Sequence, residues 1–391
     1  MITMRFFDNI LDHYSWQGVA LIATLLLLFC IQFYHYAIRY NRISRFRLMR
    51  RKRRSAENPP ISVIVVVRGE NEDFLNKQLH NILAQKYDLY EVVVVYVGGD
   101  IDYYSELQRV KEQHSNMRLT KIGANERLYI TTKQALNIGI KSAQYDNLLF
   151  TTTEAMPVSD EWIKYMARGF ERGNIVLAPM LPHFEQSYIK SYIMRMTEFH
   201  RLRNAMAAAV SGRLYYAPRC NFGFTRDLYE ATRGFNHLNI DSGENDLYLQ
   251  RIATLATPER TSAVMARHAI VAEQRPSIWA EWIETMRYNS ITERYYPTKA
   301  KSTIRREVAS RLLFFITAIA TIAVMPLEVK GIAALLLLLR YIIVVWSSRR
   351  TAHKLGESSI CWRYWIFDIV GPFVEYIISL KRHDGKAKVW R

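Results

Sequence analysis

The sequence has few cysteines and lacks the short glycine-rich motifs that bind nucleotide phosphates. Its three cysteines, Cys30, Cys220 and Cys361, are far apart and show no metal-type spacing, so a disulfide framework is not expected. Neither a G-x-x-x-x-G-K-[ST] loop nor a G-x-G-x-x-G turn occurs, which leaves P-loop and Rossmann sites without support. We find no internal repeat. The cysteine content indicates a reducing compartment or a membrane environment.

Acidic residues are scarce relative to basic ones. The 391 residues include 53 Lys and Arg but only 36 Asp and Glu, giving a formal net charge of +17. The basic residues cluster beside apolar segments, which suits anionic lipid headgroups better than nucleic acid. We therefore predict membrane lipids as partners and no nucleic-acid partner.

A long apolar run covers residues 16–37 and is long enough to cross a bilayer. A secretory signal is the alternative, but the run is too long, no A-x-A cleavage site follows, and the positive charge lies on the wrong side. Basic residues are concentrated between Arg39 and Arg54. By the positive-inside rule, the N-terminus points out and the chain after Arg39 is cytoplasmic.

Two further apolar runs, residues 312–325 and 332–346, are separated by a short turn at 326–331 and flanked on both sides by basic residues. This pattern predicts a helical hairpin that crosses the membrane and returns. Arg340 lies inside the second run, where we expect it to snorkel or contact another helix rather than take part in catalysis.

A last apolar stretch, residues 362–380, contains Asp368, Gly371, Pro372 and Glu375. These residues suit a spanning helix poorly, so we predict an interfacial or re-entrant segment, with a fourth crossing as the alternative. The predicted organisation is an anchor with a basic juxtamembrane segment (1–57), a large domain in the cytoplasm (58–303), and a hairpin with the interfacial segment (304–391). The expected location is the inner (cytoplasmic) membrane, as a multi-pass protein.

Strand-like and helix-like segments alternate in the large domain. Short, continuous β-branched runs at 61–67 and 91–96 are typical of strands buried on both faces. Further strands are expected at 117–122 and 147–151, with helices at 73–84, 103–112 and 131–143. This alternation predicts an α/β fold with a parallel sheet, whose ligands bind beyond the carboxyl ends of the strands.

Three segments together resemble a membrane-bound family-2 glycosyltransferase with the A-type nucleotide-diphospho-sugar transferase fold. Residues 59–100 resemble the family's opening strand, charged loop, "L..iL.Q.Y" helix and second strand. Residues 131–163 are similar to its "gK..AlN.gi..a..d.ilftDaD..p..dWi" segment, and 242–253 to its acidic segment that carries the catalytic base. The resemblance covers residues 59–296 and implies a nucleotide-sugar as donor substrate.

The donor-site motifs are degenerate. A nucleotide-sugar has a diphosphate leaving group, which a divalent metal held by carboxylates can neutralise. Val97 replaces the family's aspartate after the second strand, and the metal-binding Asp-x-Asp becomes Thr152-Thr153-Glu154. A threonine can ligate through its hydroxyl but adds no charge. The resemblance thus implies a weakened site for Mg²⁺ or Mn²⁺ at Glu154 and Thr152.

The catalytic base is expected in the third segment. Glu244 matches the usual base position and Asp246 a supporting one; the alternative is that both only complement a helix N-terminus. Arg68 and Glu70 match the nucleobase region, with solvated loop charge as the alternative. Lys133 matches a lysine that contacts phosphate, unless it lies on the surface. Asn221 matches an acceptor-region asparagine, although a buried turn residue is the preferred interpretation.

Other features are less specific. Residues 188–210 form a helix with one apolar and one basic face, which suits either a membrane surface or the protein core. Arg287 retains part of the Q-x-x-R-W motif that family members often carry near the membrane, and the missing remainder argues against a polysaccharide synthase. His200 and His268 are isolated, so we expect packing roles rather than metal ligation.

Two functions remain open. The first is transfer of a sugar from a nucleotide-sugar to a lipid-linked or envelope glycan acceptor at the cytoplasmic face. The second is a catalytically impaired relative that acts as a partner or scaffold in a glycan-assembly complex, which the lost donor-site acids favour. A receptor or transporter fits worse, because the scattered apolar segments form no pathway.

Overall fold

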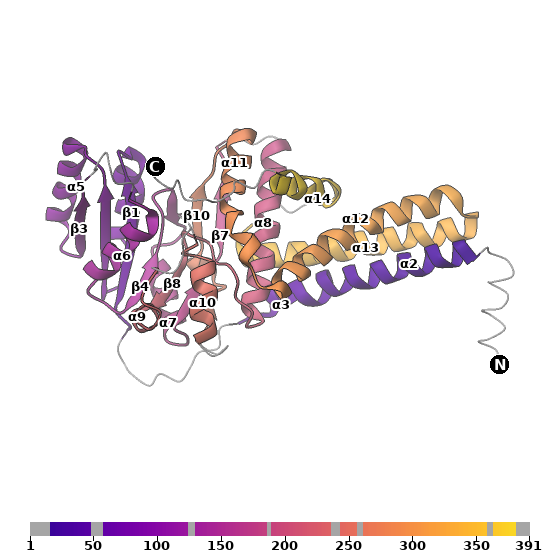
Figure 1. Ribbon diagram of the computed structural model, residues 1–391, viewed down its shortest axis with the longest axis horizontal. Coiled ribbons are helices and arrows are strands. Elements are labelled where there is room, and N and C mark those ends of the chain that lie inside the picture. Colours follow the sequence, from indigo (N-terminus) through magenta and orange to yellow (C-terminus); the bar gives the residue numbers. More distant parts are fainter. Residues whose placement is uncertain are drawn as a thin grey trace, which may run out of the picture.

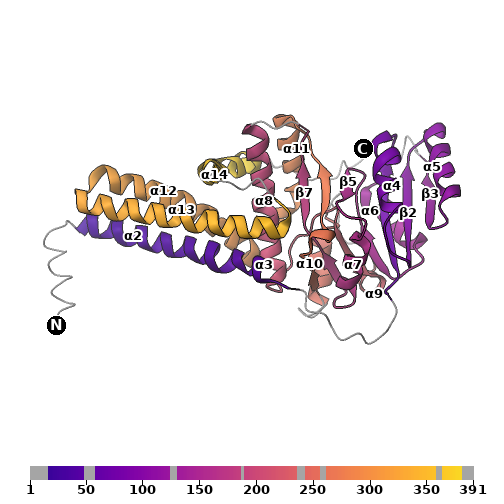
Figure 2. The same cartoon turned by 180° about the vertical axis from the view of Figure 1, so that it is seen from behind.

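The computed structural model describes residues 16–47, 58–123, 130–185, 189–235, 243–255, 261–357 and 363–380. An α/β domain lies at one end, and three long helices project from it as a rod (Figure 1). Figure 2 shows from behind that the rod is formed by helices from both ends of the chain. The basic segment after residue 47, the start of the acidic segment at Ser242, and the tail after residue 380 lie outside the described residues.

A seven-stranded sheet in the order β3-β2-β1-β4-β8-β6-β9 forms the centre of the α/β domain. The strands are β1 (Ile61–Arg68), β2 (Tyr90–Val97), β3 (Met117–Ile122), β4 (Asn147–Phe150), β6 (Ile175–Leu177), β8 (Phe222–Thr225) and β9 (Thr261–Ala263). Strands β3, β2, β1 and β4 are parallel, whereas β8 runs antiparallel to both β4 and β6. The predicted α/β class is confirmed, whereas the antiparallel strand β8 was not predicted.

The parallel half of the sheet has helical connections between its strands. They are η2 (Phe74–Gln78) with α4 (Leu79–Leu83), α5 (Ile101–Gln113) and α6 (Thr132–Ser142). Side chains from both faces of β1 and β2 are buried, as continuous β-branched runs require. Helix α6 begins with a capping box, in which Thr131 and Gln134 satisfy each other's backbone N–H groups.

A smaller sheet, β5-β10-β7, lies beside the central sheet. Its strands are β5 (Ala155–Pro157), β7 (Met180–His183) and β10 (Val271–Gln274). The antiparallel register pairs Glu273 with Ala155. This pairing brings β10 beside Glu154, the residue that precedes β5.

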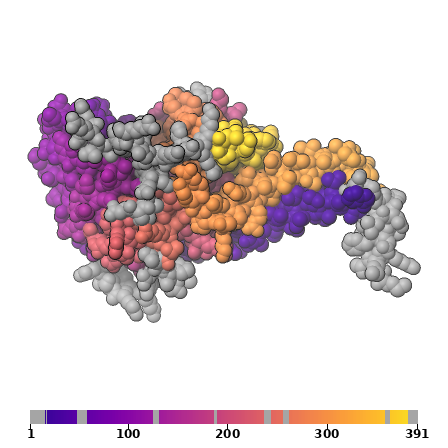
Figure 3. Space-filling model, viewed as in Figure 1, coloured from indigo at the N-terminus to yellow at the C-terminus, as the bar shows by residue number. Residues whose placement is uncertain are grey.

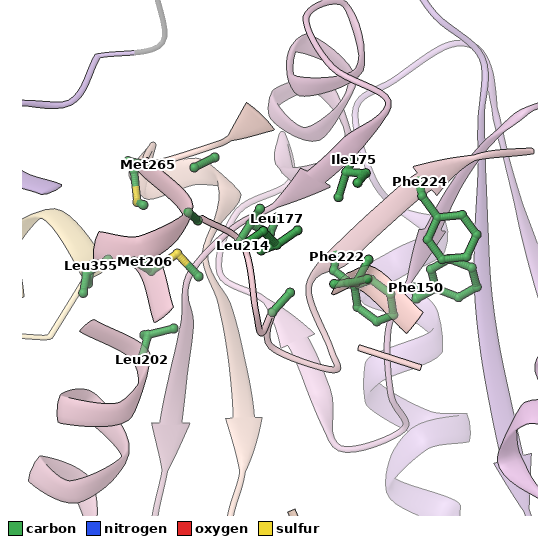
Figure 4. Packing of buried hydrophobic residues seen from close by; sticks show 14 of the residues in the cluster. Phe150, Ile175, Leu177, Leu202, Met206, Leu214, Phe222, Phe224, Met265 and Leu355 are labelled. Carbon is green, nitrogen blue, oxygen red and sulfur yellow. The ribbon is translucent and has the colours of Figure 1, made fainter. Parts of the chain in front are cut away.

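Helix α8 (Ile189–Val210) packs between the sheet and the long helices. Figure 4 shows Leu202 and Met206 of α8 close to Leu355, while Phe150, Phe222 and Phe224 pack together across β4 and β8. Arg203 is fully buried and donates to Ser348 Oγ at 2.8 Å and to the Tyr364 hydroxyl at 3.2 Å. Of the two interpretations for this helix, the structure therefore bears out the core helix and not the membrane-surface helix.

The remaining helices of the α/β domain surround the end of the sheet nearest α8. They are α7 (Trp162–Phe170), α9 (Arg226–Ala231), α10 (Leu247–Leu255), η4 (Arg267–Ala269), α11 (Trp279–Asn289) and the 3-10 turn η5 (Ile291–Tyr295). Helix α11, η5 and the residues just before α10 place side chains near the ends of the strands.

The rod consists of three helical segments. The first comprises α2 (Trp16–Phe33), η1 (Tyr34–Tyr40) and α3 (Asn41–Arg45); the others are α12 (Thr298–Val324) and α13 (Leu327–Leu355). Within the described residues, three helices are long and apolar enough to cross a membrane: Gly18–Arg45, Thr298–Val324 and Leu327–Leu355. One N-terminal helix and a C-terminal hairpin were predicted, and both are present.

Helix α14 (Tyr364–Leu380) follows the hairpin and lies in the angle between α12 and the α/β domain (Figure 3). Its Asp368 is buried against Arg340 of α13, and Arg340 also donates to Gln32 Oε1 of α2 at 2.9 Å. Arg340 thus has the interhelical partner expected of a charged residue in an apolar helix. The ion pair with Arg340 also compensates the charge of Asp368, which explains how the apolar helix α14 accommodates this residue.

Candidate active site

The carboxyl ends of β1, β2 and β4 lie at one edge of the sheet, because these strands are parallel. The register places Arg68 directly beside Val97. Thr152 and Glu154 follow β4 at the same edge. The structure thus brings together the segments that the family resemblance assigns to the donor, as expected for an α/β sheet.

A pocket of about 290 Å³ lies at this edge, near the lower limit for small-molecule sites. We call it the strand-end pocket. Its lining includes Thr152, Glu154, Arg219, Asp246 and Glu273. Five charged or polar groups from distant parts of the chain therefore converge on one small volume.

The carboxylates of Glu154 and Glu273 and the hydroxyl of Thr152 are the groups that could contact a metal ion in the strand-end pocket. The Thr152 hydroxyl donates to Glu273 Oε1 at 3.3 Å, and exposed Glu154 accepts from the Thr153 hydroxyl at 2.8 Å. Burial raises the pKa of Glu273, while Arg275, 2.9 Å from its Oε2, opposes this shift. Within the described residues, no group of three or more His, Cys, Asp or Glu could hold a metal.

These ligands suit a cation whose coordination is completed by a substrate better than a cation bound by protein groups alone. Mg²⁺ is commonly bound through one or two carboxylates plus substrate phosphates. Glu154 and Thr152 could supply such protein ligands, while Arg275 already neutralises much of the Glu273 charge. The expectation of a weakened site at Glu154 and Thr152 is consistent with this geometry and stays a prediction.

Asp246 lines the strand-end pocket although its side chain is only 2% exposed. Its Oδ2 accepts hydrogen bonds from the Thr292 hydroxyl and, at 2.9 Å, from the Tyr296 hydroxyl. Burial raises the pKa of Asp246 to about 6, while these hydrogen bonds lower it. A carboxylate with this pKa is ionised at neutral pH and is still basic enough to accept a proton.

Glu244 does not line the strand-end pocket and is 1% exposed. Its Oε1 lies 2.7 Å from Arg219 Nε, whose side chain is 32% exposed. Arg219 therefore already pairs with the carboxylate that the family resemblance implied as the catalytic base. The base role of Glu244 stays a prediction, and the geometry favours Asp246 for it.

The other predicted site residues lie outside the strand-end pocket. Arg68 is exposed and donates to the Ile130 carbonyl at 2.8 Å, and Glu70 is exposed in the same loop. Lys133 is 6% exposed, so it is not the surface lysine that was the alternative. Their roles toward a nucleotide stay predictions.

Asn221 is a buried structural residue. Its amide donates to the carbonyls of Pro179 and Ala269, both at 2.8 Å, and accepts from Trp162 Nε1 at 3.0 Å. The preferred buried interpretation is borne out, although Asn221 joins remote segments rather than capping its own turn.

Three remaining residues also have structural partners. Arg287 pairs with Glu284 at 2.5 Å. His200 Nε2 lies 3.1 Å from Glu307, and His268 stacks on Tyr165. Both histidines pack against protein groups, as expected.

Sequence reasoning missed Arg219, Glu273, Thr292 and Tyr296. Arg219 lies two residues before Asn221, which was matched to the family's acceptor region. This match was a signal that could have identified Arg219 as a site residue. Glu273 stands in a short strand with no distinctive motif. Thr292 and Tyr296 belong to a 3-10 turn and its C-cap, which no periodic pattern marks.

Comparison with known proteins supports the resemblance. Residues 62–233 match the family model for Glycosyl transferase family 2. No curated protein is similar enough in sequence to count as a relative. Over these residues the chain is therefore similar to family 2 glycosyltransferases, and its mostly parallel central sheet is consistent with the A-type fold.

A solved structure agrees on the fold. The chain is similar to the mannosyltransferase PcManGT from Pyrobaculum calidifontis, solved in complex with GDP-Man and Mn²⁺, at 17% identity and a TM-score of 0.51, covering 86% of this chain and 97% of that one. It also matches S. aureus TarS 1-349 at 12% identity, with 81% and 89% coverage and a TM-score of 0.39. The family match supports a function in glycosyl transfer.

Proposed function

We propose that the protein is an active glycosyltransferase. It moves a sugar from a nucleotide-sugar to a lipid-linked or envelope glycan acceptor at the cytoplasmic face of the inner membrane. The observation that carries this proposal is the position of Asp246, a buried carboxylate with a pKa of about 6 that lines the strand-end pocket together with Glu154. A pocket that retains a tuned base is consistent with catalysis.

The reaction is a displacement at the anomeric carbon of the donor sugar. The acceptor oxygen bonds to this carbon as the bond to the diphosphate oxygen breaks, and Asp246 takes the acceptor proton. Arg219 lines the same pocket; it is paired with Glu244 through Nε, and the remaining N–H groups of its partly exposed guanidinium could donate to the departing diphosphate. A divalent cation bound by Glu154 and Thr152 would add charge neutralisation at the diphosphate.

The basic flanks of the apolar helices support the orientation. With the N-terminus outside, the α/β domain lies in the cytoplasm, where nucleotide-sugars are available, and the α12–α13 hairpin returns to the same side. The domain organisation proposed from the sequence, with boundaries at 57/58 and 303/304, remains part of this proposal.

A scaffold role is the second candidate. Val97 and Thr152 replace two acidic residues of the family pattern, and a loss of donor binding would leave only the fold and the anchors. Such a protein would act through a glycan-assembly partner instead of through turnover.

A thermal-shift titration separates the two candidates. The full chain, purified in detergent, is titrated with nucleoside diphosphates and nucleotide-sugars, with and without Mg²⁺ or Mn²⁺. A ligand that binds only the native state raises its apparent stability. We expect one nucleotide class to raise Tm, with a larger shift when metal is present.

The matched variant is Glu154→Gln, which removes one charge without changing shape. It should lose the extra shift from metal and keep most of the metal-free shift. If no nucleotide raises Tm at millimolar concentration, the enzymatic proposal is wrong and the scaffold role is favoured.

A further inference from the structure

A second cavity, of about 890 Å³, lies where the α/β domain meets the rod. We call it the junction cavity. Its walls come from α8, α11, η5, the domain-proximal end of α12, and α14. In Figure 1 these elements surround the angle in which α14 lies. The junction cavity is about three times as large as the strand-end pocket.

The junction cavity adjoins the proposed catalytic base. Tyr216, Arg275 and Asn289 line both the junction cavity and the strand-end pocket. Tyr296 lines the junction cavity, and its hydroxyl donates to Asp246 at 2.9 Å. A hydroxyl group brought in through the junction cavity would therefore arrive beside Asp246.

The wall formed by α12 and α14 suits an apolar chain. Ile304, Val308 and Leu312 of α12 line the junction cavity, and α12 continues from there into its membrane-spanning stretch. On α14, Phe373 also lines the cavity and is 53% exposed. The cavity thus has an apolar side that faces the expected position of the bilayer.

Two cations lie on this side of the cavity. Lys301 and Arg305 line it from the first turns of α12, and neither forms an ion pair with a carboxylate in the part of the chain described. Arg201, in contrast, is held by Glu293 at 3.0 Å and Glu375 at 3.1 Å. Lys301 and Arg305 are therefore the groups able to bind an added anion.

We propose that the junction cavity binds the acceptor, and that this acceptor is a glycan linked through a phosphate or diphosphate to a polyprenyl-type lipid. The lipid chain lies against α12 and α14, the phosphate contacts Arg305 and Lys301, and a hydroxyl of the attached sugar reaches Asp246. This inference rests on the proposed function and selects the lipid-linked acceptor over a glycan that lacks a lipid phosphate.

Binding of a fluorescent polyprenyl phosphate tests the proposal. The full chain is placed in nanodiscs of zwitterionic lipid, and its affinity for the probe is compared between the wild type, Arg305→Ala and Arg306→Ala. Arg306 is the matched control, because it is the next residue of α12, is exposed, and does not line the junction cavity. Arg305→Ala should weaken binding by about tenfold or more, as loss of a charge-assisted contact implies.

A second variant tests the apolar part of the cavity. Ala309 is an exposed residue of α12 that lines the cavity, so Ala309→Trp should occupy the space and reduce probe affinity. Nucleotide-induced thermal shifts of each variant report whether the fold is intact. Because nucleotide binding is measured separately, a failure of the donor proposal is distinguishable from a failure of the lipid proposal.

Several results would overturn the inference. Equal affinities of Arg305→Ala and Arg306→Ala would exclude the assigned phosphate contact. Equal binding of the phosphate-free polyprenol would exclude phosphate recognition. Displacement of the probe by phosphatidylglycerol at equal concentration would show a general anionic-lipid surface instead of an acceptor site.

Discussion

At the Asp246 carboxylate, burial and hydrogen bonding act in opposite directions. Burial raises the pKa to about 6, whereas hydroxyl donors stabilise the charged form. Since the base must be ionised, kcat/KM should fall as pH drops below about 6. Thr292→Val removes one hydrogen-bond donor to this carboxylate, so the pKa of Asp246 should rise. The pH at which kcat/KM falls on the acid side should then move upward by about one pH unit.

The control for this pH profile is Thr285→Val. Thr285 lines the same pocket, but its hydroxyl donates to the Glu281 carbonyl at 3.0 Å. Its acid limb should match that of the wild type. An unchanged limb in Thr292→Val, or equal shifts in both variants, would contradict the assignment of Asp246 as the base.

At the residue scale, the sequence identified the groups that lie in motifs. Thr152, Glu154 and Asp246 were expected at the site and line the strand-end pocket. Glu273 could not be expected, because only the β5–β10 pairing brings it beside Glu154. The arginine partner of Glu244 was also not visible in the sequence, since residues 219 and 244 meet only through the tertiary fold.

At the scale of elements, α14 is held by charges on two sides. Asp368 pairs with Arg340, with a second contact from Arg340 Nη2 to Oδ1 at 3.1 Å, while Glu375 pairs with Arg201 of α8. Removing one member of a buried pair leaves an uncompensated charge. Arg340→Met should therefore release α14, with amide exchange over Tyr364–Leu380 accelerated by at least about tenfold.

Hydrogen–deuterium exchange measures this effect. Arg349→Met is the matched control, because Arg349 lies on the same helix and is exposed. It should leave exchange in α14 unchanged. If Arg340→Met also leaves it unchanged, the ion pair does not fix α14 against the rod.

Long elements were predicted more reliably than short ones. Strands β1 and β2 are continuous apolar runs, a pattern typical of strands buried on both faces of a sheet. The rod helices contain apolar runs long enough to cross a bilayer, and this length identifies them in the sequence. Strand β8 has four residues and β10 has four, too few to show a period. The predicted helix at 73–84 is present but begins with the π-helical turn η2.

At the scale of the whole molecule, a buried polar network joins the rod to the α/β domain. Arg39 of η1 donates to Asn204 Oδ1 of α8 at 2.7 Å, and His200 lies 3.1 Å from Glu307 of α12. These contacts place the junction cavity beside the strand-end pocket. The sequence could predict that apolar anchor helices and an α/β domain coexist, but not how they meet, because both of these contacts join residues more than 100 positions apart.

The account depends most on Asp246 as the base of a working transferase. The direct test is release of nucleoside diphosphate in native membranes containing the full chain, supplied with the nucleotide-sugar that gives the largest thermal shift. Asp246→Asn should lower this rate by at least about 100-fold while donor binding persists, and Glu244→Gln should retain most of it. Turnover by Asp246→Asn at the wild-type rate would contradict the account, most clearly if Glu244→Gln were inactive.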